Sequence, residues 1–111
     1  MRILIAGGAG YIGSTLIPRL LERGYEIDVV DLFWFGDHLP EKVTRIKKDI
    51  FDVSAKEMEK YDQVIFLAGL SNDPMAEFSP GQNFVSNAAA PAYMGFIAKQ
   101  AGVKRFIYAG S

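Results

Sequence analysis

The sequence predicts an α/β domain in which helices cover both faces of a parallel β-sheet, and three observations lead to this fold class. Apolar runs typical of buried strands alternate with helix-like segments along the chain. A glycine-rich stretch, GGAGYIG at residues 7–13, joins the first apolar run to the first helix-like segment. The 111 residues are half hydrophobic and carry a formal net charge of −1, as expected of one globular domain over residues 1–111.

Five segments are predicted to form strands. The first, Arg2 to Ala6, is nearly all apolar, which is typical of a strand buried on both faces of a parallel sheet. The others are Glu26 to Asp31, Val43 to Asp49, Asp62 to Ala68 and Lys104 to Ala109. Right-handed crossovers then predict a doubly wound, Rossmann-type sheet with the strand order 3-2-1-4-5. Ligands bind such sheets at the carboxyl ends of the strands, where the order reverses between strands 1 and 4.

Three helices should connect these strands. The first runs from Ile12 to Arg23. The second is short and begins at Ser54, where Glu57 three residues later completes the pattern of a capping box. The third is long, from Gln82 to Ala101, and Gly102 follows it as a residue suited to end a helix.

The glycine-rich turn has the pattern of a dinucleotide-binding fingerprint. Gly7 would let the chain turn sharply after the first strand, Gly10 would let a pyrophosphate approach the backbone, and Gly13 would let the helix pack closely. The N–H groups of Tyr11 and Ile12 would then face the phosphates at a helix N-terminus. The alternative is a turn with a structural role alone.

Asp31 indicates which dinucleotide is bound. It ends the second predicted strand 18 residues after Gly13, close to the ~20 expected for the carboxylate that binds the adenosine ribose. A carboxylate would repel the 2′-phosphate of NADP, and no arginine lies in the turn or just after Asp31 to neutralise it. The predicted cofactor is therefore NAD, with the alternative that Asp31 only begins a turn.

The chain resembles the extended short-chain dehydrogenase/reductase family, and within it the NAD-dependent nucleotide-sugar epimerases and dehydratases. The resemblance rests on GGAGYIGS, on Asp31 and on the run QAGVKRFIYAGS at residues 100–111. It covers essentially the whole chain and corresponds to the first half of such an enzyme. It implies that the complete enzyme acts on a nucleotide sugar, with hydride passing from a sugar carbon to NAD and often returning.

The resemblance also implies further cofactor contacts. Asp49 and Ile50, within the run KDIFD, would contact the adenine. Leu67, Ala68 and Gly69 would line the adenosine and the phosphates. The alternatives are that Asp49 is a solvated turn residue and that Ala68 and Gly69 serve only close packing.

Two residues match catalytic positions of the family. Asn87 stands where the family has a helix asparagine that holds a water in a proton relay beside the cofactor. Pro91, four residues later, has no N–H and leaves the carbonyl of residue 87 open to a water or ligand. Ser111 matches the serine that bonds the substrate hydroxyl at the end of strand 5. The alternatives are a surface asparagine and a serine without a role.

The family's catalytic pair is missing from this sequence. A tyrosine and a lysine four residues apart should follow the serine, the phenolate taking the hydroxyl proton. No tyrosine here has a lysine four residues on, and Tyr108 is too near the end to test. We therefore expect a truncated chain that lacks the catalytic segment and the substrate domain and binds NAD without turnover. The alternatives are a natural NAD-binding half-domain without chemistry and another family reaction, on an alcohol or carbonyl substrate.

Composition argues against several other classes. The chain has no cysteine and one histidine, which disfavours a disulfide framework or a metal centre. Its near-neutral charge gives no footprint for nucleic acid, and no apolar run approaches the ~20 residues of a membrane span. A cytoplasmic protein is expected.

The topology of a truncated sheet also predicts self-association. Without the later helices of a complete enzyme, one face of strands 4 and 5 should be bare, with half of the apolar side chains at residues 64–67 and 106–108 exposed. We expect a homodimer or a larger assembly through this face.

Overall fold

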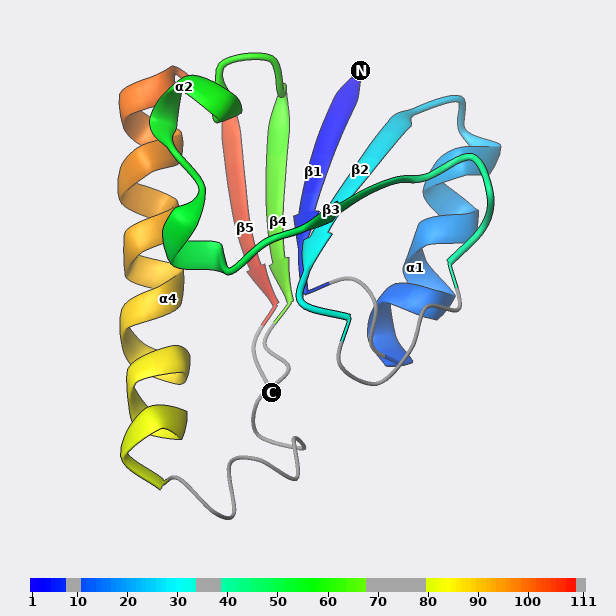
Figure 1. Cartoon of the computed structure of the whole chain (residues 1–111). Coiled ribbons are helices and arrows are strands. Elements are labelled where there is room, and N and C mark those ends of the chain that lie inside the picture. The colour runs from blue at the N-terminus through cyan, green and yellow to red at the C-terminus, as the bar shows by residue number, and fades with distance from the viewer. Residues whose placement is uncertain (8–10, 34–38, 68–79, 110–111) are drawn as a thin grey trace.

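The structure is a computed structural model, and it describes residues 1–7, 11–33, 39–67 and 80–109, without the side chains of residues 11–14, 80–88 and 109. Its centre is a parallel sheet of five strands in the order β3-β2-β1-β4-β5 (Figure 1). The strands are β1 (Arg2–Ala6), β2 (Glu26–Asp31), β3 (Thr44–Lys47), β4 (Gln63–Leu67) and β5 (Arg105–Ala109). The helices are α1 (Tyr11–Glu22), the short 3-10 helix η1 (Ile50–Asp52), α2 (Ala55–Met58) and α4 (Pro80–Ala101).

The predicted fold class and strand order are confirmed. β1 and β2 have the predicted bounds, and the other strands and helices differ from prediction by one or two residues at their ends. β3 ends at Lys47 rather than Asp49, because Asp49 leaves the ladder to cap η1. The capping box of α2 is present, with Ser54 and Glu57 each accepting from the other's backbone N–H. No helix in the described part of the chain is long and apolar enough to cross a membrane.

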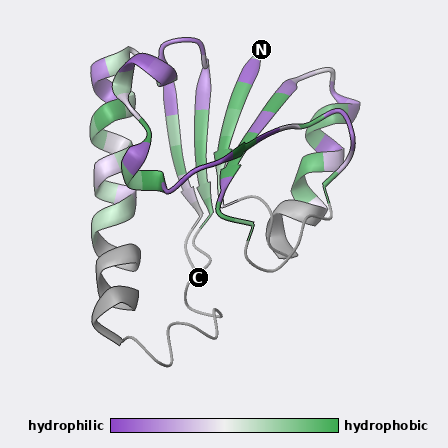
Figure 2. Cartoon of the chain, in the orientation of Figure 1, coloured by the Kyte–Doolittle hydropathy of each residue, from purple (hydrophilic) through white to green (hydrophobic). Residues whose placement is uncertain are grey.

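Alternation along the strands divides the core into two layers. The first, which we call the α4-side core, lies between the sheet and the helices α2 and α4, and Leu4, Val64 and Met94 are fully buried in it. The second, the α1-side core, lies between the sheet and α1, with Ile5 and Ile17 at its centre. Figure 1 shows α1 and α4 on opposite sides of the sheet, and Figure 2 shows hydrophobic colour along β1, β2 and β4.

The predicted bare face of strands 4 and 5 is wrong for β4. Ile65 and Leu67, which point away from α4, are only 7% and 4% exposed because they pack into the α1-side core. Their neighbour on β5, Ile107, packs against the same core and is partly buried. The exposed aromatic of β5 is Tyr108, 47% exposed, which lies on the α4 side with its ring 5.7 Å from that of Phe66.

A buried polar cluster holds the amino ends of the strands together. Asp28 of β2 is 4% exposed and accepts hydrogen bonds from the Tyr61 hydroxyl at 2.6 Å and from Nη2 of Arg2 at 3.2 Å. Burial first, and then the hydrogen bond to Asp28, raises the pKa of Tyr61. The backbone N–H of Arg2 donates to Asp62 at 2.8 Å. This cluster ties β1, β2 and the start of β4 together at the edge opposite the predicted ligand site.

Candidate functional site at the carboxyl edge of the sheet

Gly7 makes the turn at the end of β1, and only glycine fits there. Its φ is +81°, in the region that side chains disfavour. A Cβ at this position would lie 2.6 Å from the carbonyl oxygen of Leu67 in β4. The N–H of Gly7 donates to Val30 of β2 at 2.9 Å, so the turn is held between the neighbouring strands. The chain therefore has no side chain at Gly7, the position where β1 ends and the strand order reverses.

The first turn of α1 follows this bare backbone. Tyr11, Ile12 and Gly13 form it, and their N–H groups belong to those that a helix leaves without intrahelical partners. No acidic residue lies in this first turn, so the helix itself supplies no carboxylate there against the positive end of its dipole. Gly10 lies outside the described residues.

Asp31 ends β2 beside this turn, and its carboxylate has a defined local partner. Oδ1 accepts a hydrogen bond from the N–H of Phe33 at 2.8 Å. Phe33 has a φ of +57°, unusual for a bulky residue, and its side chain packs against the α1-side core. The carbonyl of Asp31 accepts from the N–H of Lys48 at 3.2 Å, so the chain leaving β3 is bonded directly to the chain leaving β2.

The segment after β3 contains the predicted adenine contacts. Asp49 is the exposed N-cap of η1, and its Oδ1 accepts from the N–H of Phe51 at 2.9 Å. Ile50 is partly buried against the α4-side core. Asp49 therefore has the role in a turn that was the alternative to a ligand contact. Its contact with the adenine stays a proposal.

For the remaining predicted site residues, the structure describes a buried side chain, the backbone alone, or nothing. The side chain of Leu67 is buried in the α1-side core, so its backbone is the part that could face a ligand. Asn87 lies in α4 with its backbone alone described, and Pro91 lies inside the same helix. Ala68, Gly69 and Ser111 lie outside the described residues. The structure thus brings Gly7, the start of α1, Asp31, Asp49, Ile50 and the backbone of Leu67 to one edge of the sheet.

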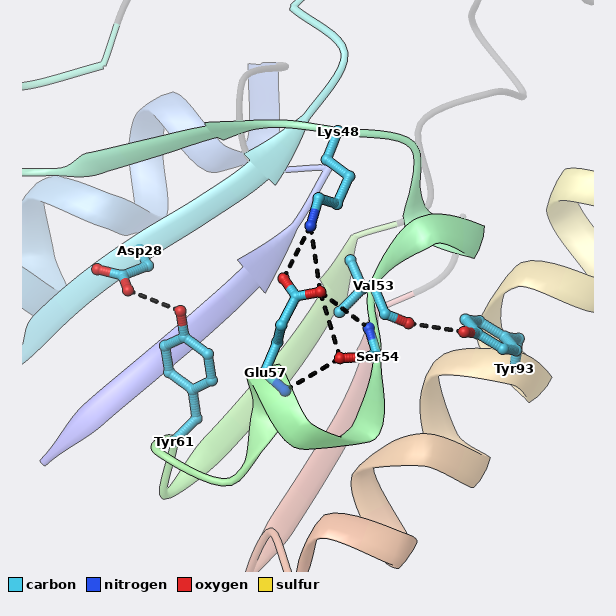
Figure 3. Close-up of polar contacts among 7 residues, drawn as sticks. All are labelled: Asp28, Lys48, Val53, Ser54, Glu57, Tyr61 and Tyr93. Carbon is cyan, nitrogen blue, oxygen red and sulfur yellow. Dashed lines mark hydrogen bonds and ion pairs between the residues drawn. The ribbon is translucent and has the colours of Figure 1, made fainter.

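Lys48 and Glu57 form an ion pair that sequence reasoning missed. Nζ of Lys48 donates to the two carboxylate oxygens of Glu57 at 3.1 and 3.0 Å, which connects the end of β3 to α2 (Figure 3). The hydrogen bond from Lys48 is the largest cause that holds the pKa of Glu57 below its usual value. The capping box could be read from the spacing of Ser54 and Glu57, but no sequence pattern pointed to Lys48.

Tyr93 of α4 makes a second contact that the sequence did not signal. Its hydroxyl donates to the carbonyl of Val53 at 2.6 Å (Figure 3). Its ring lies 5.5 Å from that of Phe51. The residues that the hydrogen bond joins are 40 positions apart in the chain. No pattern in the sequence indicated a role for Tyr93.

Comparison with known proteins places this arrangement in a family. Residues 3–111 match the NAD dependent epimerase/dehydratase family. The chain belongs to this family. The match extends from β1 to the end of the chain and so includes every element of the carboxyl-edge site.

Relatives of this epimerase/dehydratase chain are longer enzymes. It is 32% identical to the UDP-glucose 4-epimerase of Homo sapiens, over 99% of this chain and 37% of that enzyme. It is also 32% identical to UDP-glucuronic acid decarboxylase 1 of Danio rerio, over 93% of this chain and 26% of the enzyme. The chain thus spans about a third of the length of the relatives that it matches, or less.

Solved structures of epimerases share the fold. The UDP-glucose 4-epimerase of Thermotoga maritima with UDP-glucose superimposes with a TM-score of 0.81 at 28% identity, covering 97% of this chain and 37% of that one. The Thermus thermophilus UDP-glucose 4-epimerase in complex with NAD gives 0.78 at 27% identity, covering 96% and 36%. These neighbours confirm the family resemblance that the sequence indicated.

Proposed function

We propose that this chain is the NAD-binding part of an enzyme that acts on a nucleotide sugar. The Gly7 turn is the observation that carries the proposal. Gly7 has no room for a Cβ, lies at the switch point of a doubly wound sheet, and precedes the N-terminus of α1 by four positions. Relatives and structural neighbours that bind NAD or act on UDP-sugars support the same conclusion.

The residues of the carboxyl edge fit NAD. The Gly7 turn and the N–H groups of Tyr11 and Ile12 would hold the pyrophosphate, as would Gly10 and Gly13 by their place in the fingerprint. The carboxylate of Asp31 would accept hydrogen bonds from the adenosine ribose. Asp49 and Ile50 would border the adenine, and the backbone of residues 67–69 would line the adenosine and phosphates.

NAD supplies a hydride acceptor when it is bound. The chain's own contribution is to bind and orient it at the edge where Asn87 and Ser111 are proposed to hold a relay water and the substrate hydroxyl. Within these 111 residues we expect binding without turnover, because no tyrosine that can be tested has a lysine four residues on. NADH formation by the 111-residue chain with UDP-glucose would contradict this expectation.

Binding of NAD and NADP to Asp31 variants tests the proposal. Asp31→Ala should weaken the binding of NAD by ~1–3 kcal/mol, the size of a charge-assisted hydrogen bond. Asp31→Asn keeps an acceptor for the N–H of Phe33 while removing the charge, so it should narrow the preference for NAD over NADP. Glu22→Gln, at an exposed acid at the end of α1 and away from the proposed site, is the control for a general change in charge. Equal affinities of the unchanged protein for NAD and NADP in titration calorimetry would refute the role of Asp31.

A further inference from the structure

We propose that Tyr93 is a positioning residue for the adenine end of the dinucleotide. It fastens the segment 49–53 to α4, and this inference rests on the proposed function. Neither the glycine fingerprint nor the family resemblance assigned it a role.

The order of the strands places the segment 49–53 where the adenine should lie. The proposed phosphate site is at the end of β1 and the proposed ribose site, Asp31, is at the end of β2. A ligand extended in the same direction next meets the chain that leaves β3. That chain is bonded to the end of β2 through the N–H of Lys48 and the carbonyl of Asp31, 3.2 Å apart.

Hydrogen bonds within the segment 49–53 fix its shape. The N–H of Phe51 donates to the Asp49 carboxylate at 2.9 Å, and the N–H of Asp52 donates to the Asp49 carbonyl at 2.9 Å. The N–H of Val53 donates to the carbonyl of Ile50 at 3.1 Å. Such internal bonds define a turn but do not determine where it stands relative to the rest of the molecule.

Tyr93 supplies a fixed point at the end of the turn. The 2.6 Å bond from its hydroxyl to Val53 is at the short end of the range for neutral hydroxyl donors. Its ring lies 5.5 Å from Phe51, a side chain that is 41% exposed and is therefore only partly held by burial. The next residue of α4, Met94, is fully buried in the α4-side core, so the helix that carries Tyr93 is itself anchored.

The Lys48–Glu57 ion pair fastens the same stretch on its other side, but less firmly. Both side chains are about a third or more exposed, at 34% and 40%, and exposed pairs are weakened by solvent. The hydroxyl of Tyr93 therefore provides a firmer hold on the segment than the ion pair does.

Tyr93→Phe and Tyr61→Phe form a matched pair of test variants. Each removes one hydroxyl whose hydrogen bond is 2.6 Å long, Tyr93 beside the proposed adenine site and Tyr61 at the opposite edge of the sheet. We expect Tyr93→Phe to raise the dissociation constants of NAD and of ADP-ribose about three- to tenfold, the effect of one lost hydrogen bond. Tyr61→Phe should leave both constants within about twofold, although it lowers stability. Calorimetric titrations are made at a temperature where circular dichroism shows both variants folded.

Hydrogen exchange provides a readout that does not depend on the ligand. The amides of Phe51, Asp52 and Val53 should exchange faster in Tyr93→Phe and at an unchanged rate in Tyr61→Phe. If the unchanged protein binds no NAD, the proposed function fails. If it binds NAD and Tyr93→Phe binds it equally well, or both variants lose affinity alike, the positioning role of Tyr93 is overturned while the proposed function stands.

Discussion

Replacing Gly7 by alanine should destabilise the protein far more than the same change at Gly24. The two glycines share the conformation that disfavours side chains, with φ of +81° at Gly7 and +84° at Gly24. They differ in their surroundings. A Cβ at Gly7 would lie 2.6 Å from the carbonyl oxygen of Leu67, whereas nothing lies within 4 Å of a Cβ at Gly24.

The magnitude follows from these two terms. An alanine in the left-handed region costs roughly 1–2 kcal/mol, and the loss of unfolded-state freedom returns about 0.4–1 kcal/mol. Gly24→Ala carries this net cost alone. Gly7→Ala adds a contact shorter than real Cβ atoms adopt, against backbone that lies in the central sheet, so it adds the ~1–3 kcal/mol typical of overpacking.

Urea unfolding followed by circular dichroism measures the difference between the two variants. The unfolding free energy of Gly7→Ala should fall below that of Gly24→Ala by the overpacking cost. Of these two variants, only Gly7→Ala should bind NAD more weakly. Gly102→Ala is a second control, with φ of +79° and open surroundings. If Gly7→Ala is no less stable than the two controls, the close approach of β1 to β4 at this turn does not exist as described.

Two further changes test the polar contacts. Tyr61→Phe should lower the unfolding free energy in urea by about 1–3 kcal/mol, because the buried Asp28 loses a hydrogen-bond donor; an unchanged midpoint would contradict the buried cluster. Glu57 has its pKa lowered from 4.5 in the folded state, so its pairing stabilises fully above about that pH and is lost as pH falls through the folded pKa. Glu57→Gln should therefore cost up to about 1 kcal/mol at pH 7 and flatten the acid side of a thermal stability profile; a variant as acid-sensitive as the unchanged protein would rule this out.

Local signals were sufficient to predict most of the fold. Four of the five residues of β1 and three of the six residues of β2 are apolar, and Gly7 and Gly24 end the strand and the helix before them through their positive φ. The capping box at Ser54 depends on residues three apart and could be read directly. The strand order then followed from the alternation of strands and helices, because right-handed crossovers leave few topologies.

Contacts between distant residues could not be predicted in the same way. The Tyr93–Val53 bond joins α4 to the stretch after η1 across 40 positions, and a single sequence contains no sign of such a pairing. Lys48 likewise pairs with Glu57 because β3 ends at Lys47 and the chain turns through η1 before it enters α2. Asp49 shows the same limit within the site, since a turn role was only the alternative to the expected adenine contact, and nothing in the sequence indicated that its carboxylate would cap η1.

The burial of β4 changes where self-association should be sought. The prediction treated β4 and β5 alike, but β4 lies inside the sheet between β1 and β5, and its side chains on both faces are covered. What remains is β5, the last strand of the sheet order, on which Tyr108 is half exposed. An edge strand offers backbone groups to a second copy, and charges along it prevent such pairing.

Light scattering on a pair of charge variants distinguishes association through β5 from association through the exposed aromatic side chain of α4, Phe96. At micromolar concentration the unchanged chain should show at least twice the 12.3 kDa chain mass. Tyr108→Lys, on β5, should return the chain to a monomer, whereas Phe96→Lys, on α4 at a side chain that is 60% exposed, should not. A monomeric unchanged chain would end the prediction of self-association, and dissociation by Phe96→Lys alone would move the contact from β5 to α4, because a charge weakens an interface only where it must be desolvated.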